Sequence, residues 1–266
     1  ILFLIIFIIF IKFSTEKVLA NSYKVSDIEI SEPYNLNFSK EKVIDVAFKN
    51  AFEELIFTLL TSEYYYLNKD VNIKIIKSLI DSFSIVDEKF IDKKYIANFN
   101  VNFNKKEVLN YLYKNNIYAS IPQKKKLFLL PILVDTNRSD ISLLSENPFY
   151  LNWTKFTKKY HLLDYVLPNE DLDDLNIIKN NINNLEDYEF KEIITKYQLK
   201  DYIIVILFKN EKSIRVLTRI KFNNEFILLN ENFPYKSINN DIEAVINSLK
   251  NSYENSWKKI NLINTS

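Results

Sequence analysis

The chain of 266 residues contains no glycine and no cysteine. Phosphate-binding loops, the dinucleotide-binding G-x-G-x-x-G motif and the G-x-S-x-G nucleophile elbow all depend on glycine for tight turns or close approach of the backbone to a ligand. The sequence therefore excludes all three motifs. The lack of cysteine also excludes disulfides, thiolate nucleophiles, iron–sulfur clusters and cysteine-ligated zinc.

The chain also lacks an excess of charge of either sign. Lys and Arg number 35 and Asp and Glu number 34, which leaves a net charge of +1. A nearly neutral chain has no overall field that attracts nucleic acid or acidic lipid, so we expect no nucleic-acid partner. The chain is 47% hydrophobic and 26% charged, as is common for folded proteins.

The first eleven residues, 1–11, are all apolar. A membrane-spanning helix needs about 20 apolar residues, so this run fits the core of a secretory signal peptide. Val18 and Ala20 occupy the small-residue positions before a cleavage point, which predicts a signal peptide over 1–20 cut between Ala20 and Asn21. We expect a periplasmic or secreted protein. The alternative, suggested by Lys12 and Lys17 after the apolar run, is an uncleaved segment that anchors the protein to the inner membrane.

The remaining residues, about 245, suffice for two domains. The fold class expected is α+β or α/β, in two small mixed units. We assign an N-terminal α+β domain to 21–119, a linker with Pro122 and three lysines to 120–126, a C-terminal α/β domain to 127–260 and a tail to 261–266.

The first unit is predicted to have the order strand, helix, helix, strand, strand, helix. Apolar periodicity places strands at 23–30, 83–91 and 94–104, with a bulge in the first near Ser26-Asp27. Helices are expected at 39–60, at 70–80 and, after an Asn104 cap, at 105–115. Asp92-Lys93 would close the hairpin, at a turn that normally favours glycine.

The second unit is predicted to be a mixed sheet with flanking helices. Strands are expected at 127–134, 165–167, 202–208, 213–222 and 226–233, and helices at 148–160, 172–180, 189–197 and 240–257. The run at 127–134 is almost entirely apolar, which is typical of a strand buried on both faces.

Few residues qualify as candidates for chemistry. His161 is the only histidine and would be the default general base, but no partner residues for a triad or metal site accompany it. We favour a structural role near a helix C-terminus. The aromatic residues Trp153, Phe156 and Tyr160 have helical spacing and are expected to belong to the core.

Two charged clusters have competing interpretations. Glu170, Asp171, Asp173 and Asp174 offer oxygen ligands for Ca²⁺ but lack the glycine and distal glutamate of an EF-hand, so we favour a helix start capped by Asn169. The lysines at 124–126 are interpreted as a solvated linker, with contact to an acidic partner or membrane as the alternative.

Several elements together resemble an exported proteobacterial family catalogued as domain of unknown function number twenty sixty-six. They are Tyr23-x-Val25, the helix with Ala47, Ala51 and Leu55, the strand from Tyr95-x-Ala97 to Val101-x-Phe103, and Leu129-Leu130-Pro131. The resemblance implies a periplasmic protein without established activity or catalytic residues.

These observations favour a non-enzymatic accessory or protein-binding module of the cell envelope. We expect no catalytic residue, cofactor or metal, and another envelope protein as the partner. The alternative is a carboxylate-based envelope hydrolase or a small-ligand-binding protein. Two carboxylates about 5 to 10 Å apart in a cleft would favour the hydrolase, whereas an apolar face rimmed by polar residues would favour the binding module.

Overall fold

The computed structural model describes residues 22–68, 71–138, 140–234 and 238–263. The chain divides into two compact units, one formed by Ile1–Phe52 and Val71–Asn116 and the other by Glu53–Asp70 and Ile117–Ser266. Helices and strands are mixed, which confirms the predicted fold class. The predicted signal peptide over 1–20 and its cleavage site between Ala20 and Asn21 lie outside the described residues.

Residues 53–70 were expected in the first domain but group with the second unit. The reason is a set of backbone contacts around Leu59. Ser120 donates to the Leu59 carbonyl from its backbone N–H, at 2.9 Å, and from its hydroxyl, at 2.8 Å. Because these groups are buried, they need partners, and this pairing ties the residues around Leu59 to the chain after 117.

The first unit is built on a three-stranded antiparallel sheet in the order β1-β3-β2. Its strands are β1 (Ser22–Pro33), β2 (Ile80–Ile91) and β3 (Lys94–Asn104). The alternation predicted for β3 is confirmed, because every second side chain from Tyr95 to Phe103 is fully buried. The predicted bulge in β1 is confirmed by a register shift between Val25 and Ile28.

Three helices accompany this sheet: α2 (Lys40–Leu59), whose last turns belong to the second unit, α4 (Ile73–Ser78) and α5 (Lys105–Lys114). Phe52 of α2 has its ring centroid 6.1 Å from that of Phe103 on β3. Asn104 caps α5 as predicted, since its side chain accepts from the Glu107 N–H at 3.1 Å. The helix predicted over 70–80 is shorter than expected, because Ile80 already opens β2.

The second unit contains a mixed sheet in the order β5-β4-β7-β8-β9, with β6 paired to β4. Its strands are β4 (Lys125–Asp135), β5 (Asp140–Ser142), β6 (Leu163–Val166), β7 (Tyr202–Lys209), β8 (Ser213–Phe222) and β9 (Glu225–Pro234). β4 is parallel to β6 and β7, while β7, β8 and β9 form an antiparallel meander. The predicted strands are all present, and β5 is additional.

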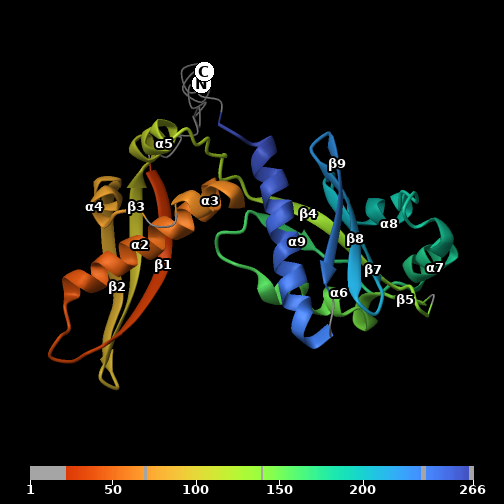
Figure 1. Ribbon diagram of the computed structural model, residues 1–266, viewed down its shortest axis with the longest axis horizontal. Helices are drawn as coiled ribbons and strands as arrows, with labels where there is room; N and C mark the ends of the chain where they lie inside the picture. Colours follow the sequence, from red (N-terminus) through yellow and green to blue (C-terminus); the bar gives the residue numbers. More distant parts are fainter. Residues whose placement is uncertain (1–21, 69–70, 139, 235–237, 264–266) are drawn as a thin grey trace, which may run out of the picture. The chain divides into compact units, whose positions relative to one another are not determined.

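Helices cover both faces of this sheet, α9 and α7–α8 lying on opposite sides of it (Figure 1). The helices of this unit are α3 (Ser62–Asn68), α6 (Pro148–Asn152), α7 (Leu172–Asn180), α8 (Lys191–Lys196) and α9 (Ile238–Ile260), with 3₁₀ turns at Leu144–Glu146, Trp153–Phe156 and Ile182–Asn184. In the described parts of the chain, no helix combines the length and apolarity needed to cross a membrane.

Three local expectations are corrected. The predicted linker 120–126 overlaps β4, which begins at Lys125. The helix predicted over 148–160 ends its α-helical part at Asn152 and its 3₁₀ part at Phe156. The predicted tail 261–266 is not simply a tail, because Leu262 forms a β-bridge with Ser120.

Candidate functional site

The sheet of the second unit is covered unevenly on the side of α7 and α8. Buried residues of these helices pack against β4 and β7, as Ile178 and Ile193 do in one core cluster. On the neighbouring part of that face, Phe226 and Leu228 of β9 remain 73% and 66% exposed. Large apolar side chains this exposed, on neighbouring positions of one strand face, mark a candidate binding surface.

A groove of about 980 Å³ lies at this place. One side is α8 with the residues that follow it, including Ile194 and Leu199, and the floor is the outer face of β7, β8 and β9. Most of its exposed surface is apolar, as is common for ligand sites, although about half of the lining residues have polar or charged side chains. We call this surface the β9 groove. Its lining residues are Glu189, Lys191, Ile194, Thr195, Gln198, Leu199, Lys200, Tyr202, Ile204, Arg219, Ile220, Lys221, Asn223, Asn224, Phe226, Ile227 and Leu228.

Arg219 is the most firmly held cation of the β9 groove. Its Nη2 donates to the carbonyl oxygens of Tyr188 at 2.6 Å and Leu185 at 3.3 Å, and its guanidinium lies 5.4 Å from the centre of the Phe190 ring. Its Nε is buried and has no hydrogen-bond partner. Burial lowers the pKa of Arg219 from its ordinary value, but arginine keeps its charge.

Three further cations line the groove, Lys191, Lys200 and Lys221. Lys221 Nζ lies 5.6 Å from the ring centre of Phe226 and 5.8 Å from that of Tyr202, and Lys200 is exposed. Among the described residues, no ion pair joins Lys200, Arg219 or Lys221 to a carboxylate. The one carboxylate of the groove, Glu189, forms an ion pair with Lys191, which lowers the pKa of Glu189.

The site residues predicted from the sequence do not include these groove residues. Their signal was present, because residues 226–229 are apolar at four consecutive positions, whereas a strand with one solvated face alternates. On β8, the residues at 215, 219 and 221 are all basic. Because side chains alternate along a strand, the sequence also indicates that these three share one face. Which other elements cover that face depends on tertiary packing.

A second group of polar residues lies on the opposite side of the sheet, along α9. Lys250, Glu254 and Lys258 are 0%, 4% and 5% exposed and follow one another at intervals of four residues. Glu254 Oε1 accepts from the backbone N–H groups of Leu162 and Leu163, at 2.9 and 2.8 Å. Burial raises the pKa of Glu254 and lowers the pKa of Lys250 to about 8.

His161 lies in this second group, and not at a helix end as expected. The preceding 3₁₀ turn ends at Phe156, so the predicted interaction with a helix dipole is wrong. Its Nδ1 accepts from the Lys158 N–H at 3.2 Å. Burial, together with the charges of Lys250, Lys258 and Lys158, lowers the pKa of His161 to about 4.

The aromatic residues predicted to share a helical face lie in two different environments. Trp153 is fully buried and Phe156 packs against the same core, so these two confirm the core interpretation. Tyr160 comes after the 3₁₀ turn and stacks on Phe57, with ring centroids 4.4 Å apart. The prediction that all three residues lie on one helical face is therefore wrong.

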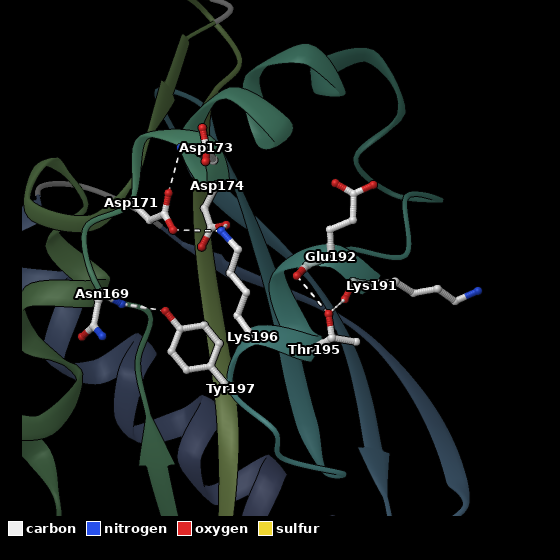
Figure 2. Close-up of polar contacts among 9 residues, drawn as sticks. All are labelled: Asn169, Asp171, Asp173, Asp174, Lys191, Glu192, Thr195, Lys196 and Tyr197. Carbon is white, nitrogen blue, oxygen red and sulfur yellow. Dashed lines mark hydrogen bonds and ion pairs between the residues drawn. The ribbon is translucent and has the colours of Figure 1, made fainter.

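The acidic cluster is a helix start, as favoured. Asp171, and not Asn169, caps α7 by accepting from the Asp173 N–H at 2.8 Å. Figure 2 shows Lys196 of α8 reaching both Asp171 and Asp174, with Nζ 2.8 Å from the Asp171 carboxylate. Groups of at least three residues suited to hold a metal ion are absent from the described residues.

The lysine run is only partly solvated. Lys124 and Lys126 are exposed, but Lys125 forms an ion pair with Asp201 and lies 5.5 Å from the ring centre of Trp257. The solvated-linker interpretation is therefore wrong for Lys125, whose strand position brings its side chain against the body of the unit.

Comparison with known proteins adds no assignment to these sites, because no family model, no curated protein and no solved structure matches the chain.

Proposed function

We propose that this protein is an exported, non-enzymatic binding module of the cell envelope, which receives an extended segment of another envelope protein along β9. The observation that carries the proposal is the position of the β9 groove beside an unpaired strand edge. β9 stands at the end of the strand order, so one of its edges pairs with β8 and the other has no described strand partner.

The geometry of the β8–β9 hairpin defines what this edge offers. Two residues, Asn223 and Asn224, separate the paired Phe222 and Glu225. In a hairpin with a two-residue turn, the closing pair exchanges hydrogen bonds, so every second residue from Phe226 directs its N–H and C=O away from the partner strand. Phe226 and Leu228 therefore combine free backbone groups with apolar side chains on the groove side.

Natural proteins usually protect long edge strands by lysines, proline or a covering element. β9 has ten residues, has no lysine and carries its single proline at the last position, Pro234. An added strand would gain backbone hydrogen bonds from the edge and side-chain contacts from the groove, which is how several domains bind peptides.

Export is part of the proposal and rests on the sequence. Cleavage between Ala20 and Asn21 would release the two units into the periplasm or the medium. An uncleaved segment over 1–20 would instead hold them at the inner membrane. Both forms leave the β9 groove on the exported part of the chain.

The hydrolase alternative gains no support from the β9 groove. A glycosidase-type mechanism requires two carboxylates in one cleft. The described lining of the groove contains one, Glu189, and it is engaged with Lys191. The alternative of a carboxylate hydrolase stays a prediction without a candidate pair in this groove.

Site-specific photo-crosslinking in the producing cells tests the proposal. A photoreactive phenylalanine analogue replaces Leu228 in one variant and Leu172 of α7 in another; these two leucines have similar exposure, 66% and 77%. We expect one discrete crosslinked product from position 228 and none from position 172. Equal crosslinking from both positions, or none from position 228, would contradict the proposed function.

A further inference from the structure

The described lining of the β9 groove carries an excess of positive charge, with four cationic side chains against one carboxylate. Arg219 and Lys221 lie on its floor and Lys200 at its side, and Glu189, the one carboxylate of the described lining, is already paired with Lys191. The whole chain carries a net charge of only +1, so this is a local concentration of charge and not a general property of the surface.

The contacts of Arg219 leave it suited to an anion. The groups that accept its hydrogen bonds are neutral carbonyl oxygens of the segment before α8, so the guanidinium is fixed in place without a direct ion pair to a described carboxylate. Asp187 and Glu189 act on its charge only from a longer distance. A guanidinium held in this way binds a carboxylate without first losing conformational freedom. Lys221 touches aromatic ring faces and can extend toward the groove.

The register of the hairpin aligns these cations with the exposed apolar residues. Arg219 is paired with Leu228, and Lys221 with Phe226. Both cations therefore lie one strand inward from the apolar positions along which a bound segment would run. Their spacing of two residues, about 6.6 Å, equals the spacing of side chains on one face of an extended chain.

We infer that the segment bound along β9 is acidic and carries carboxylates at alternate positions facing Arg219 and Lys221. The inference rests on the proposed function, since it specifies the chemistry of the partner segment at that site. The carboxylates would meet the cations, and the methylene groups of glutamate would cover Phe226 and Leu228.

A second copy of this chain fits the site less well. In antiparallel pairing of two β9 strands, the groove would receive the side chains that β9 itself directs to that face. These are Phe226, Leu228, Asn230 and Asn232, which carry no charge. Glu225 and Glu231 alternate with them and point to the other face. The charges of the groove therefore favour a different, acidic chain.

Fluorescence anisotropy with a defined probe tests this inference. The probe is a labelled peptide of about six residues in which leucine and glutamate alternate, and its uncharged counterpart has glutamine at each glutamate. We expect the full exported chain to bind the glutamate peptide at least about tenfold more tightly than the glutamine peptide.

The matched variants are Lys221→Glu, on β8 in the groove, and Lys212→Glu, in the turn between β7 and β8. Both substitutions change the charge by the same amount. Lys212 is exposed and lies outside the groove. We expect Lys221→Glu to weaken binding of the glutamate peptide about tenfold and Lys212→Glu to leave it within about twofold, with unchanged melting temperatures.

Equal binding of the two peptides, failure of the glutamate peptide to bind, or equal weakening by both variants would each overturn the inference. None of these results alters the crosslinking test at position 228. A partner captured there without any effect of Lys221→Glu would keep the proposed function and remove the acidic specificity. Concentration-dependent dimers held through β9 would identify a second copy as the occupant and overturn the inference.

Discussion

At the residue scale, the buried side chains of α9 differ in how well their surroundings satisfy them. Lys250 is fully buried, and the one hydrogen bond of its ammonium to a described residue goes to Thr157 Oγ1 at 3.1 Å, while Trp153 and Tyr165 offer ring faces at 5.6 Å. Lys258 donates to the carbonyl oxygens of Phe57 and Leu60. The two lysines therefore have opposite expected effects on stability when they are replaced.

Replacing Lys250 with methionine should raise the free energy of unfolding at pH 7. Burial lowers the pKa of Lys250 from 10.5 to about 8, so the charged form is less favourable in the folded chain than in the unfolded chain. This difference corresponds to about 3 kcal/mol below pH 8 and disappears as pH rises from 8 to 10.5. We expect Lys250→Met to gain about 1 to 3 kcal/mol in urea unfolding at pH 7, and less at pH 10.

Lys258→Met is the matched control. It leaves carbonyl groups at the end of α2 without their donor, which should lower the free energy of unfolding by about 1 to 3 kcal/mol. A loss of stability in Lys250→Met as large as in Lys258→Met would contradict the account of Lys250.

His161 should make the protein sensitive to acid. Its pKa is lowered from 6.5 to about 4 in the folded chain, so the unfolded chain binds a proton between these values when the folded chain does not. Stability therefore falls as pH drops from 6.5 to 4, by at most about 3 kcal/mol. As pH falls across this range, the free energy of unfolding should decrease more steeply in the wild type than in His161→Gln. Parallel decreases in the two proteins would contradict the lowered pKa of His161.

At the element scale, the turns show how a chain without glycine is built. Nine described residues other than glycine have positive φ, including Asp27, Asp92, Lys93 and Asn223. Aspartate and asparagine tolerate this conformation better than most residues, whereas lysine and phenylalanine do not. Asp92 and Lys93 both have positive φ, at 50° and 58°, in the two-residue turn between β2 and β3.

Lys93→Gly should therefore stabilise the first unit. Glycine adopts φ near 58° without the steric cost that lysine bears, and this gain, about 1 kcal/mol, exceeds the added entropy of the unfolded chain. Thermal unfolding should show a higher midpoint. Lys94→Gly, one residue further in β3, is the control and should lower the midpoint, because glycine weakens a strand; a lower midpoint in both would refute the strain at Lys93.

The edge of β9 gives a test of how the partner segment binds. Asn230→Pro removes an N–H group that is directed outward, whereas Asn230→Ala removes only the side chain. If the partner adds a strand, the proline variant should lose crosslinking at position 228 and about tenfold in affinity for the glutamate peptide, while the alanine variant keeps both. Equal behaviour of the two variants, with the same melting temperature, would argue for binding without strand addition.

Most elements could be predicted because their signals are local. The alternation of β3, the Asn104 cap and the periodic α7 depend on residues next to each other in the chain. The helix after Pro148 was predicted too long, because the apolar spacing of Trp153, Phe156 and Tyr160 continues where the backbone has already left the helix. Apolar periodicity reflects which side chains pack against the protein, and here packed side chains continue beyond the end of the helix.

At the scale of the whole molecule, the candidate site could not be predicted because it depends on where helices stop covering a sheet. Alternation in β8 places Arg219 and Lys221 on one face, but only the packing of α8 shows that the neighbouring part of this face is open. The same holds for Lys125, whose partner Asp201 is far away in the sequence.

The predicted export of the molecule has a direct consequence. Cleavage after Ala20 would give a mature chain that begins with Asn21, and mass spectrometry of protein from the periplasmic fraction should find this terminus. Recovery of the chain only from the membrane fraction, with residues 1–20 attached, would support the uncleaved anchor in its place.

Hydrogen exchange of the β9 amides, followed residue by residue by NMR, tests the central claim most directly. In the free protein, the amides of Phe226, Leu228 and Asn230 should exchange rapidly, while those of Ile227 and Leu229 are protected by pairing with β8. Addition of the glutamate peptide should protect the first three amides. Protection that appears elsewhere in the second unit, with exchange along β9 unchanged, would contradict the claim that this edge is the binding site.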